Sequence, residues 1–238
     1  MKISITGVTG LVGSHLVKLL SSPNSDGSKN DIKALIREDS IVDHLKTYED
    51  VDYVIGGLED KESLQQLVEG SEVLIHLAHF NGDGATKTEN ELIQANLNGS
   101  IDLLEAAKNA KVKQVVFMSS MLIFGTIQPS VGESNPLDES HPVKPVNLYG
   151  AIKSSIESFC FSYARNRAFD ISILRPVKIY GVRPDLPKSE WFETVDFLSI
   201  NYNIDVKGST KYVSVDAVCQ AITKVLGNRE ASGKIYHL

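Results

Sequence analysis

The 238-residue chain is poor in cysteine and has no excess of basic side chains. Its two cysteines, Cys160 and Cys219, lie within helical apolar patterns, so the sequence predicts buried free thiols in a reducing compartment and no disulfide. The 24 Lys and Arg residues are outnumbered by 30 Asp and Glu residues, which gives a formal net charge of −6. This balance excludes a protein that binds nucleic acid through bulk positive charge.

The chain also lacks long apolar runs and metal-ligand spacings. No run approaches the roughly 20 residues that cross a bilayer, and residues 1–5 already show a strand pattern in place of a signal peptide. The six His and two Cys residues show no spacing typical of a zinc site. We therefore expect a cytoplasmic protein with no membrane partner and no metal.

What the sequence does contain is a regular alternation of short apolar runs and longer amphipathic stretches. The short runs predict strands at 3–6, 32–36, 52–55, 73–77, 115–118, 171–174 and 235–238. The amphipathic stretches predict helices at 12–20, 62–68, 92–107, 152–168 and 215–226. Such alternation requires crossover connections, so we predict an α/β fold with a Rossmann-like, doubly wound parallel sheet.

A glycine-rich turn follows the first predicted strand. Residues 6–13 read TGVTGLVG, so Gly7, Gly10 and Gly13 open the first predicted helix. Glycines at such a turn allow a tight bend and a close approach of the backbone to a pyrophosphate, and the helix N-terminus supplies N–H donors. The spacing GxxGxxG differs from the standard GxGxxG, but its place at the first strand-to-helix turn predicts dinucleotide binding.

Arg37 stands directly after the second predicted strand. An NAD-binding protein would carry an acidic residue there for the ribose 2′-hydroxyl, whereas an arginine suits a 2′-phosphate through charge-assisted hydrogen bonds. The sequence thus favours NADP(H) over NAD(H). The alternative is a solvated surface arginine, which leaves NAD(H) possible.

Tyr149 and Lys153 are four residues apart at the start of a predicted helix, on one face. A fixed cation beside a phenol stabilises the phenolate and lowers the pKa, which makes a general acid/base. Ser119 and Ser120 end the strand predicted at 115–118, at the same sheet edge as the glycine turn. A serine there is placed to orient a substrate oxygen, although a turn serine would give the same pattern.

Taken together, these motifs resemble the extended short-chain dehydrogenase/reductase family, in its NAD(P)-dependent epimerase/dehydratase branch. The resemblance covers residues 1–181 and resumes near 213. It is supported by further stretches at 71–78, 96–107, 115–125, 138–153 and 174–181.

The resemblance implies a role for each matching residue. Tyr149 would be the catalytic acid/base, Lys153 would tune it and hold the nicotinamide ribose, and Ser120 would bind the reacting oxygen. Asn96 would support either the cofactor or the active-site helix. The residues implied to lie against the dinucleotide are Gly7, Thr9, Gly10, Leu11, Val12, Leu58, Leu77, Ala78, Asn96, Ser119, Pro176 and Ile179.

The chain departs from the family pattern at several site positions. Gly57 replaces the aspartate that usually hydrogen-bonds the adenine, and Phe124 replaces the usual tyrosine before Gly125. His79 replaces a small residue, so we expect it to reshape the substrate cleft. Lys178 stands where a small or amide residue is usual, and it would either pair with a substrate phosphate or carboxylate or be a solvated lysine.

The resemblance also implies the organisation of the molecule. We expect a single NAD(P)-binding domain over 1–238 with a small, shortened C-terminal substrate lobe formed mainly by 182–212. The aromatic residues expected to pack this lobe are Trp191, Phe192 and Phe197. A homodimer packed through the helices near Asn90 and after Tyr149 is expected, with Ile152, Ile156 and Phe159 as candidate contacts, although an intramolecular core would give the same pattern.

Three functions remain open, two of them enzymatic and one non-catalytic. The first is an epimerase/dehydratase-type oxidoreductase that acts by hydride transfer on a sugar or nucleotide-sugar hydroxyl or carbonyl. The second is an NADPH-dependent carbonyl reductase resembling the dihydroflavonol reductases, which Arg37 and the short lobe favour. The third is a non-catalytic dinucleotide sensor or scaffold, which the presence of Ser120, Tyr149 and Lys153 argues against. Net consumption of NADPH would separate the first two.

Overall fold

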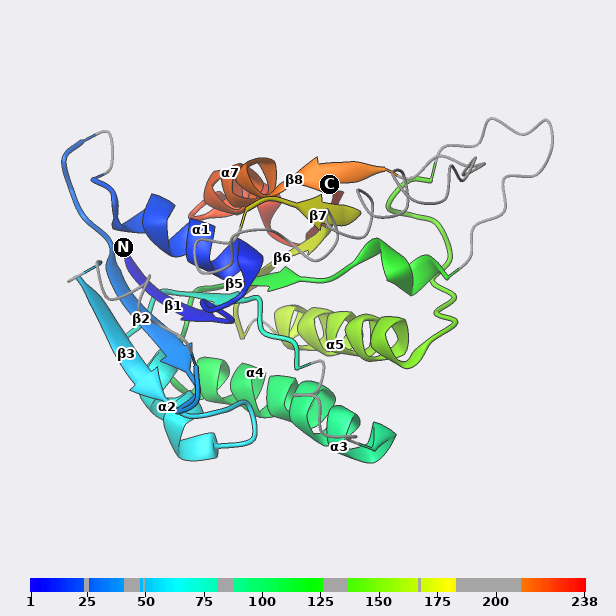
Figure 1. Cartoon of the computed structure of the whole chain (residues 1–238), viewed down its shortest axis with the longest axis horizontal. Helices are drawn as coiled ribbons and strands as arrows, with labels where there is room; N and C mark the ends of the chain where they lie inside the picture. The colour runs from blue at the N-terminus through cyan, green and yellow to red at the C-terminus, as the bar shows by residue number, and fades with distance from the viewer. Residues whose placement is uncertain are drawn as a thin grey trace, which may run out of the picture.

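The computed structural model describes residues 1–23, 26–40, 48, 50–80, 88–125, 137–166, 168–182 and 211–238. Its centre is a seven-stranded sheet in the order β3-β2-β1-β4-β5-β6-β9, in which all neighbours are parallel (Figure 1). The strands are β1 (Lys2–Thr6), β2 (Asp31–Ile36), β3 (Val51–Ile55), β4 (Val73–His76), β5 (Gln114–Met118), β6 (Asp170–Arg175) and β9 (Lys234–His237). The order reverses between β1 and β4, which is where ligands of open α/β sheets bind.

Helices cover both faces of the sheet, which confirms the predicted doubly wound α/β fold. Figure 1 shows α1 (Leu11–Ser21) and α7 (Val215–Val225) on one face. The other face carries α2 (Lys61–Val68), α4 (Gly99–Asn109) and α5 (Leu148–Arg165). Two apolar clusters result, one between the sheet and each helical layer. Because β5 is buried along its whole length, its sequence QVVFM is a continuous run with little alternation.

The helix predicted at 92–107 is interrupted. It consists of α3 (Glu89–Ile93), a π-helical turn η1 (Gln94–Asn98) and then α4. Thr88 and Glu91 form a capping box at the start of α3, so the helix begins earlier than its apolar pattern. A π-helical turn inside a helix often marks a functional site.

Helix α5 begins at Leu148, next to the start expected at Tyr149 and before its apolar pattern, which begins at 152. The side chain of Asn147 accepts a hydrogen bond from the backbone N–H of Gly150 at 2.8 Å, and this N-cap fixes the first turn. Of the candidate dimer contacts on α5, Ile152 and Ile156 are buried in the chain's own core, which corrects that interpretation. Phe159 remains exposed.

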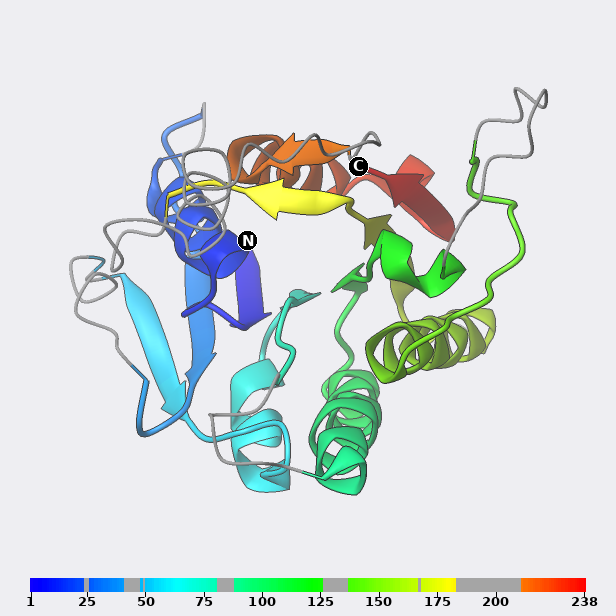
Figure 2. The same ribbon diagram turned by 45° about the vertical axis from the view of Figure 1, so that its right-hand side comes forward.

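A second, two-stranded parallel pair, which the sequence did not predict, lies beside the main sheet (Figure 2). It joins β7 (Lys178–Tyr180) to β8 (Tyr212–Ser214). Two short 3-10 helices complete the described elements, η2 (Met121–Phe124) and η3 (Arg229–Ala231). The lobe predicted over 182–212, with its three aromatic residues, lies almost entirely outside the described residues and stays a prediction.

Both cysteines are free and buried, as predicted. Burial raises the pKa of the Cys160 thiol and raises that of Cys219 to about 12, so neither thiol is activated. Among the described helices, none is long and apolar enough to span a membrane. Over the same residues, no group of three or more His, Cys, Asp or Glu side chains could hold a metal ion.

Candidate active site

The glycine turn joins β1 to α1 at the carboxyl edge of the sheet. Gly7 has a left-handed backbone with φ of +78°, and a Cβ there would lie 2.7 Å from the backbone nitrogen of Ala78. A Cβ on Gly13 would lie 2.1 Å from the carbonyl oxygen of Gly7, so α1 packs directly on the turn. Gly10 caps α1 without a side-chain hydrogen bond, and the first N–H groups of a helix suit an anion. This backbone cradle fits a dinucleotide pyrophosphate.

The other predicted phosphate contacts lie in the same segment. Thr9 is in the turn, and Leu11 and Val12 are the first residues of α1. Across the turn, Leu77 and Ala78 follow β4, and their backbone N–H groups bond to the carbonyl and the hydroxyl of Thr6, at 3.3 and 3.2 Å. The structure therefore brings these two predicted segments together.

A chain of hydrogen bonds links η1 to the segment that follows β4, next to the glycine turn. Its geometry assigns every donor: the Ser100 hydroxyl donates to the carbonyl of Asn96, so it must accept from Nε2 of His76, 2.9 Å away. Nδ1 of His76 then accepts from the Thr6 hydroxyl at 2.7 Å, and that hydroxyl accepts from the N–H of Ala78. Burial, with a smaller contribution from the charge on Lys153, lowers the pKa of His76 to about 3, so the ring is neutral.

Asn96 holds the segment that follows β4. It lies in η1 with 1% of its surface exposed, and its side-chain oxygen accepts from the N–H of Phe80 at 2.6 Å. Its side-chain nitrogen lies 2.9 Å from the carbonyl oxygens of Phe80 and Leu92. Of the two roles expected for Asn96, these contacts favour structural support, while direct contact with a cofactor stays a prediction.

The three candidate catalytic residues meet at the carboxyl end of β5. Lys153 is almost fully buried on α5, and its ammonium donates to the carbonyl of Met118 at 2.8 Å. The same nitrogen lies 5.9 Å from the ring centre of Tyr149. Ser120 follows β5 and accepts a hydrogen bond from the N–H of Leu122. Strand, helix and turn thus place a hydroxyl, a phenol and an ammonium in one cluster.

The direction of the Tyr149 pKa differs from the sequence-based expectation. We expected a lowered pKa from the neighbouring cation, but burial raises the pKa of Tyr149, and a hydrogen bond with the Ser120 side chain opposes this only in part. Burial also lowers the pKa of Lys153 to about 8, although the carboxylate of Glu157 opposes that shift. Desolvation thus outweighs the Ser120 hydrogen bond at Tyr149 and the Glu157 charge at Lys153.

Ser119 carries a buried hydroxyl for which the described residues offer no hydrogen-bond partner. Buried polar atoms are almost always paired, so an unpaired one at a crevice points to a group that is supplied by a ligand or water. Its position beside the catalytic cluster fits the predicted role nearer the cofactor.

His79 lies directly against Tyr149. The two ring centres are 4.6 Å apart in an edge-to-face arrangement, with an interplanar angle of 77°. Burial and then the charge on Lys153 lower the pKa of His79 to about 3. A neutral imidazole therefore borders the place where a substrate would meet the phenol, and it offers one donor and one acceptor.

Arg37 is half-exposed at the end of β2, with 48% of its side chain accessible. Its guanidinium carbon lies 5.4 Å from the ring centre of Phe80, and its Nε is 3.3 Å from the carboxylate of Asp39. The residue therefore has contacts on both sides and is not a freely solvated arginine.

Gly57 lacks the carboxylate that the family pattern has at this position, but the carboxylate of Glu59 lies next to it. A Cβ on Gly57 would lie 2.6 Å from the carboxylate atoms of Glu59, so the Glu59 side chain folds back over this position. Leu58 is buried in the core, and its carbonyl oxygen would meet a Cβ on Gly99 at 2.6 Å. A contact between Leu58 and a cofactor stays a prediction.

The segment after β6 borders the same cluster on its other side. Pro176 is buried, and its carbonyl accepts from the N–H of Met121 at 3.0 Å, which ties the β6 end to the turn after β5. Ile179 in β7 packs against the core. Lys178 is exposed in β7, and a role in substrate binding stays a prediction.

Sequence reasoning missed a buried group behind the cluster. Arg175 and Glu157 form a two-bond ion pair at 2.6 and 3.0 Å, with side-chain exposures of 3% and 5%. The guanidinium also lies 5.1 Å from the ring centre of Phe124. Beside it, the carboxylate of Glu139 accepts from the backbone N–H of His237, which ties the segment before α5 to β9. In the sequence, the only sign of this ion pair is that Arg175 and Glu157 are charged residues within apolar runs.

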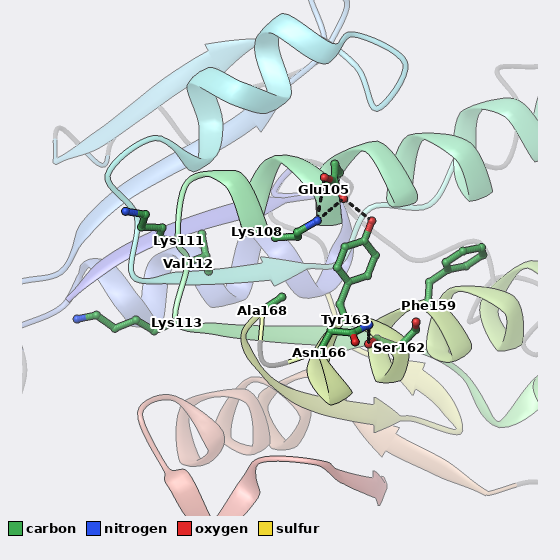
Figure 3. Close-up of a pocket in the computed structure, with 10 residues that line it drawn as sticks. All are labelled: Glu105, Lys108, Lys111, Val112, Lys113, Phe159, Ser162, Tyr163, Asn166 and Ala168. Carbon is green, nitrogen blue, oxygen red and sulfur yellow. Dashed lines mark hydrogen bonds and ion pairs between the residues drawn. The ribbon is translucent and has the colours of Figure 1, made fainter.

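A cavity of about 750 Å³ lies elsewhere, between the C-terminal ends of α4 and α5 (Figure 3). Its lining comes from the segments that enter β5 and β6, at the opposite end of these strands from Ser120. In Figure 3 the Lys108 ammonium and the Tyr163 hydroxyl both point toward the carboxylate of Glu105. Lys111 and Lys113 point away from the Tyr163 ring. None of the predicted site residues lines this cavity, so the candidate active site lies at the carboxyl edge of the sheet and not here.

Comparison with known proteins decides the family. A model of the NAD dependent epimerase/dehydratase family matches residues 3–238. The chain belongs to this family. The match spans the glycine turn, the catalytic cluster and the last strand, and it confirms the resemblance drawn from the motifs.

Members of the epimerase/dehydratase family with different activities are similar to this chain. A dTDP-D-glucose 4,6-dehydratase of Dictyostelium discoideum is 26% identical over 262 residues, which cover 100% of this chain and 58% of that protein. A 4-hydroxy-2-methyl-3-oxo-4-farnesyl-3,4-dihydroquinoline-1-oxide ketoreductase of Stigmatella aurantiaca is 24% identical over 240 residues, covering 100% of this chain and 68% of that one. The chain thus spans little more than half the length of the first relative.

Solved structures in this family share the fold. The crystal structure of a dTDP-glucose 4,6-dehydratase from Streptomyces venezuelae, with NAD and TYD bound, superposes with a TM-score of 0.82 at 24% identity. The superposition covers 100% of this chain and 75% of that one.

Proposed function

We propose that the protein is an NAD(P)-dependent oxidoreductase that acts on a hydroxyl or carbonyl group of a nucleotide sugar. The observation that carries this proposal is the convergence of Ser120, Tyr149 and Lys153 at the carboxyl end of β5, beside a glycine cradle at the sheet's switch point. Sugar chemistry is supported by the dTDP-D-glucose dehydratase among the relatives.

Each catalytic residue has a separate task in this proposal. A bound nicotinamide cofactor supplies hydride exchange with the substrate carbon. Tyr149 holds or moves the proton on the substrate oxygen, and its raised pKa keeps the phenol protonated and ready to donate at neutral pH. Ser120 hydrogen-bonds the same oxygen. Lys153, fixed by the carbonyl of Met118, supplies positive charge and holds the nicotinamide ribose.

The remaining predicted residues line the two ends of the crevice. His79 borders the substrate side of Tyr149 and would bind a substrate hydroxyl. Lys178, exposed in β7, would pair with a substrate phosphate or carboxylate. Glu59 would take over from the missing acid at Gly57 as the acceptor for the adenine amino group.

A preference for NADP(H) over NAD(H) belongs to the proposal. Arg37 stands directly after β2, at the position where an NAD-binding protein would carry an acidic residue. Its side chain is accessible to a 2′-phosphate. The family's name and the NAD bound in the solved dehydratase favour NAD(H) instead. Measuring the affinities for both cofactors therefore tests this preference.

The second candidate function is an NADPH-dependent carbonyl reductase. Arg37 favours it, because a net reduction consumes NADPH, whereas an epimerase or dehydratase regenerates its cofactor. The ketoreductase among the relatives is consistent with this chemistry. A non-catalytic dinucleotide sensor is disfavoured, since binding the dinucleotide phosphates would need none of Ser120, Tyr149 and Lys153.

Calorimetric titration with NAD⁺, NADP⁺, NADH and NADPH tests the cofactor site, and the variant Arg37→Asp tests the preference. Tight NADP(H) binding that shifts toward NAD(H) in the variant would support the reductase. A preference for NAD(H), or a cofactor that co-purifies and does not exchange, would support the epimerase/dehydratase function. Absence of binding to all four by protein that carries no co-purified cofactor would contradict the proposed function.

Tyr149→Phe tests the chemistry with dTDP-glucose and UDP-glucose as first substrates. We expect cofactor affinity to stay nearly intact, because the phenol hydroxyl contributes one hydrogen bond among many. Turnover should fall by about 10²- to 10⁴-fold, which is the usual contribution of general acid/base catalysis. Unchanged turnover would refute the role of Tyr149.

A further inference from the structure

Lys153 carries a positive charge inside the protein. Only 2% of its surface is exposed, and its ammonium donates to the carbonyl oxygen of Met118 at 2.8 Å. The same nitrogen lies 5.0 Å from the ring centre of Phe117. A carbonyl oxygen and an aromatic ring stabilise an ammonium, but neither supplies a full negative charge. A buried ammonium without such a charge tends to lose its proton, because burial favours the neutral form.

The ionisable side chains around this ammonium differ in whether they are charged. Within the described part of the chain they come from α5 itself, from β4 and from the segment after β4: Tyr149, Glu157, Cys160, His76 and His79. Burial raises the pKa of the phenol and of the thiol and lowers that of both imidazoles to about 3, so these groups are neutral at pH 7. The carboxylate of Glu157 is therefore the negative charge in this set.

Arg175 of β6 holds this carboxylate in place and in its ionised form. Its Nη2 and Nε donate to the two oxygens of Glu157 at 2.6 and 3.0 Å. The two side chains are only 3% and 5% exposed. A bidentate pair of this kind fixes the orientation of a carboxylate as well as its charge. Because the pair is buried behind the candidate site, a cofactor can bind in the crevice without displacing it.

Glu157 follows Lys153 by one turn of α5. Residues four apart on a helix lie on the same face, so the carboxylate and the ammonium share this side of α5. Little water screens charges in a buried region, and the carboxylate therefore stabilises the ammonium through space. The helix geometry thus connects the ion pair to the residue that carries the positive charge of the site.

We propose that Glu157, held ionised by Arg175, is a positioning residue for the reaction, because its charge keeps the Lys153 ammonium protonated beside Tyr149. This inference rests on the role of Lys153 in the proposed function. Burial lowers the pKa of Lys153 to about 8, although the charge of Glu157 opposes this shift. Without that charge the pKa would fall further, toward neutral pH, and the lysine would lose its proton where it has to hold a nicotinamide ribose.

The variant Glu157→Gln tests the inference, because it keeps the size of the side chain and removes its charge. We would titrate protein freed of co-purified cofactor with NADH or NADPH, whichever the wild type binds more tightly, by calorimetry between pH 6.5 and pH 10. Wild-type affinity should fall on the alkaline side, as Lys153 loses its proton. In Glu157→Gln this fall should begin at a pH lower by about one unit or more, the usual effect of losing a nearby opposite charge. In Lys153→Met the alkaline fall should be absent.

Two further variants separate this electrostatic role from a structural one. The double variant Glu157→Leu/Arg175→Met removes the carboxylate without leaving another charge buried, so it serves if Glu157→Gln does not fold. Its alkaline fall should also move to lower pH. The matched control is Glu105→Gln, the same substitution at the exposed ion pair with Lys108 on α4, which should leave the alkaline fall where it is in the wild type.

A purely structural role for the ion pair would weaken cofactor binding equally at every pH. An alkaline fall at the same pH in the wild type and in the folded Glu157 variants would therefore overturn the inference while the proposed function stands. The same holds for a wild type without an alkaline fall, or for a fall that persists in Lys153→Met. If the cofactor-free wild type bound neither NADH nor NADPH at any pH, the proposed function would fail as well.

Discussion

His76 is a buried histidine whose protonation state is set by its neighbours. Thr6 donates to one ring nitrogen and Ser100 accepts from the other, so both are satisfied only by the neutral ring. A second proton on the ring would face the Thr6 hydroxyl, which already donates to it, and would leave a charge inside the core. Because this chain of bonds reaches Ala78 and Asn96, it links the crevice to the protein's stability.

We predict that acid destabilises the protein through this residue. The pKa of His76 is about 3 in the folded state, below its ordinary value of 6.5, so at acidic pH the unfolded chain binds a proton that the folded chain does not. Stability is therefore full above pH 6.5 and falls as the pH drops toward 3, by up to about 1.4 kcal/mol per pH unit for this one group.

Urea unfolding between pH 8 and pH 4.5 measures this dependence in the wild type and in His76→Asn. The variant should lose stability overall but show a shallower fall at acidic pH. Above pH 7.5, where neither state binds the proton, the two curves should run parallel. Equal acid slopes would refute a neutral, titration-shifted His76.

At the scale of elements, α5 combines proposed catalytic residues and structural residues along one row. Tyr149, Lys153 and Glu157 follow one another at four-residue spacing, so they lie on the same helix face. The first two enter the crevice, whereas Glu157 pairs with Arg175 of β6. The ion pair therefore fixes the helix that carries Tyr149 against β6, the strand beside the candidate site.

We predict that Glu157→Gln strongly destabilises the fold. Removing one partner leaves the Arg175 charge buried and uncompensated, which typically costs about 3–5 kcal/mol. Denaturant unfolding should show this loss, and the double variant Glu157→Leu/Arg175→Met should recover much of it, because no charge is then left buried. The solvent-exposed pair of Lys108 and Glu105 provides the control, since Lys108→Met should change stability far less. A similar loss in both single variants would contradict the prediction.

The same elements show what a sequence can predict. The seven strands of the main sheet were predictable, because a parallel strand covered on both faces must be an apolar run. The three-residue strands β7 and β8 were not, since their pairing depends on segments far apart in the chain. The π-helical turn at Asn96 was not predicted either, and the Asn96 side chain there bonds to Phe80, which lies 16 residues earlier in the chain.

The site shows the same division. The identity and spacing of Tyr149 and Lys153 indicated their shared face, but the direction of the Tyr149 pKa depends on burial by the rest of the fold. Likewise, Arg37 was recognisable from its place after a strand, whereas its contact with Phe80 joins two segments that only the folded sheet brings together.

At the scale of the whole molecule, the homodimer expected from the family resemblance stays a prediction. The exposed surface of α4 and α5 is where it would form, and the structure leaves one large apolar side chain of the expected set there, Phe159, with 39% of its surface exposed. Phe159 borders the cavity between these helices, together with lysines from α4 and its connection to β5 (Figure 3).

We predict a dimer at micromolar concentration in size-exclusion chromatography with light scattering, and a shift toward monomer in Phe159→Glu. A buried carboxylate without a partner is costly, so a single substitution at the centre of an interface weakens it strongly. The control is Leu19→Glu on α1, which places the same charge on a residue of similar exposure, 42%, on the opposite face of the sheet. Because both variants add one negative charge, a shift in Phe159→Glu alone identifies the interface. A monomeric wild type, or equal shifts in the two variants, would contradict dimerisation through α4 and α5.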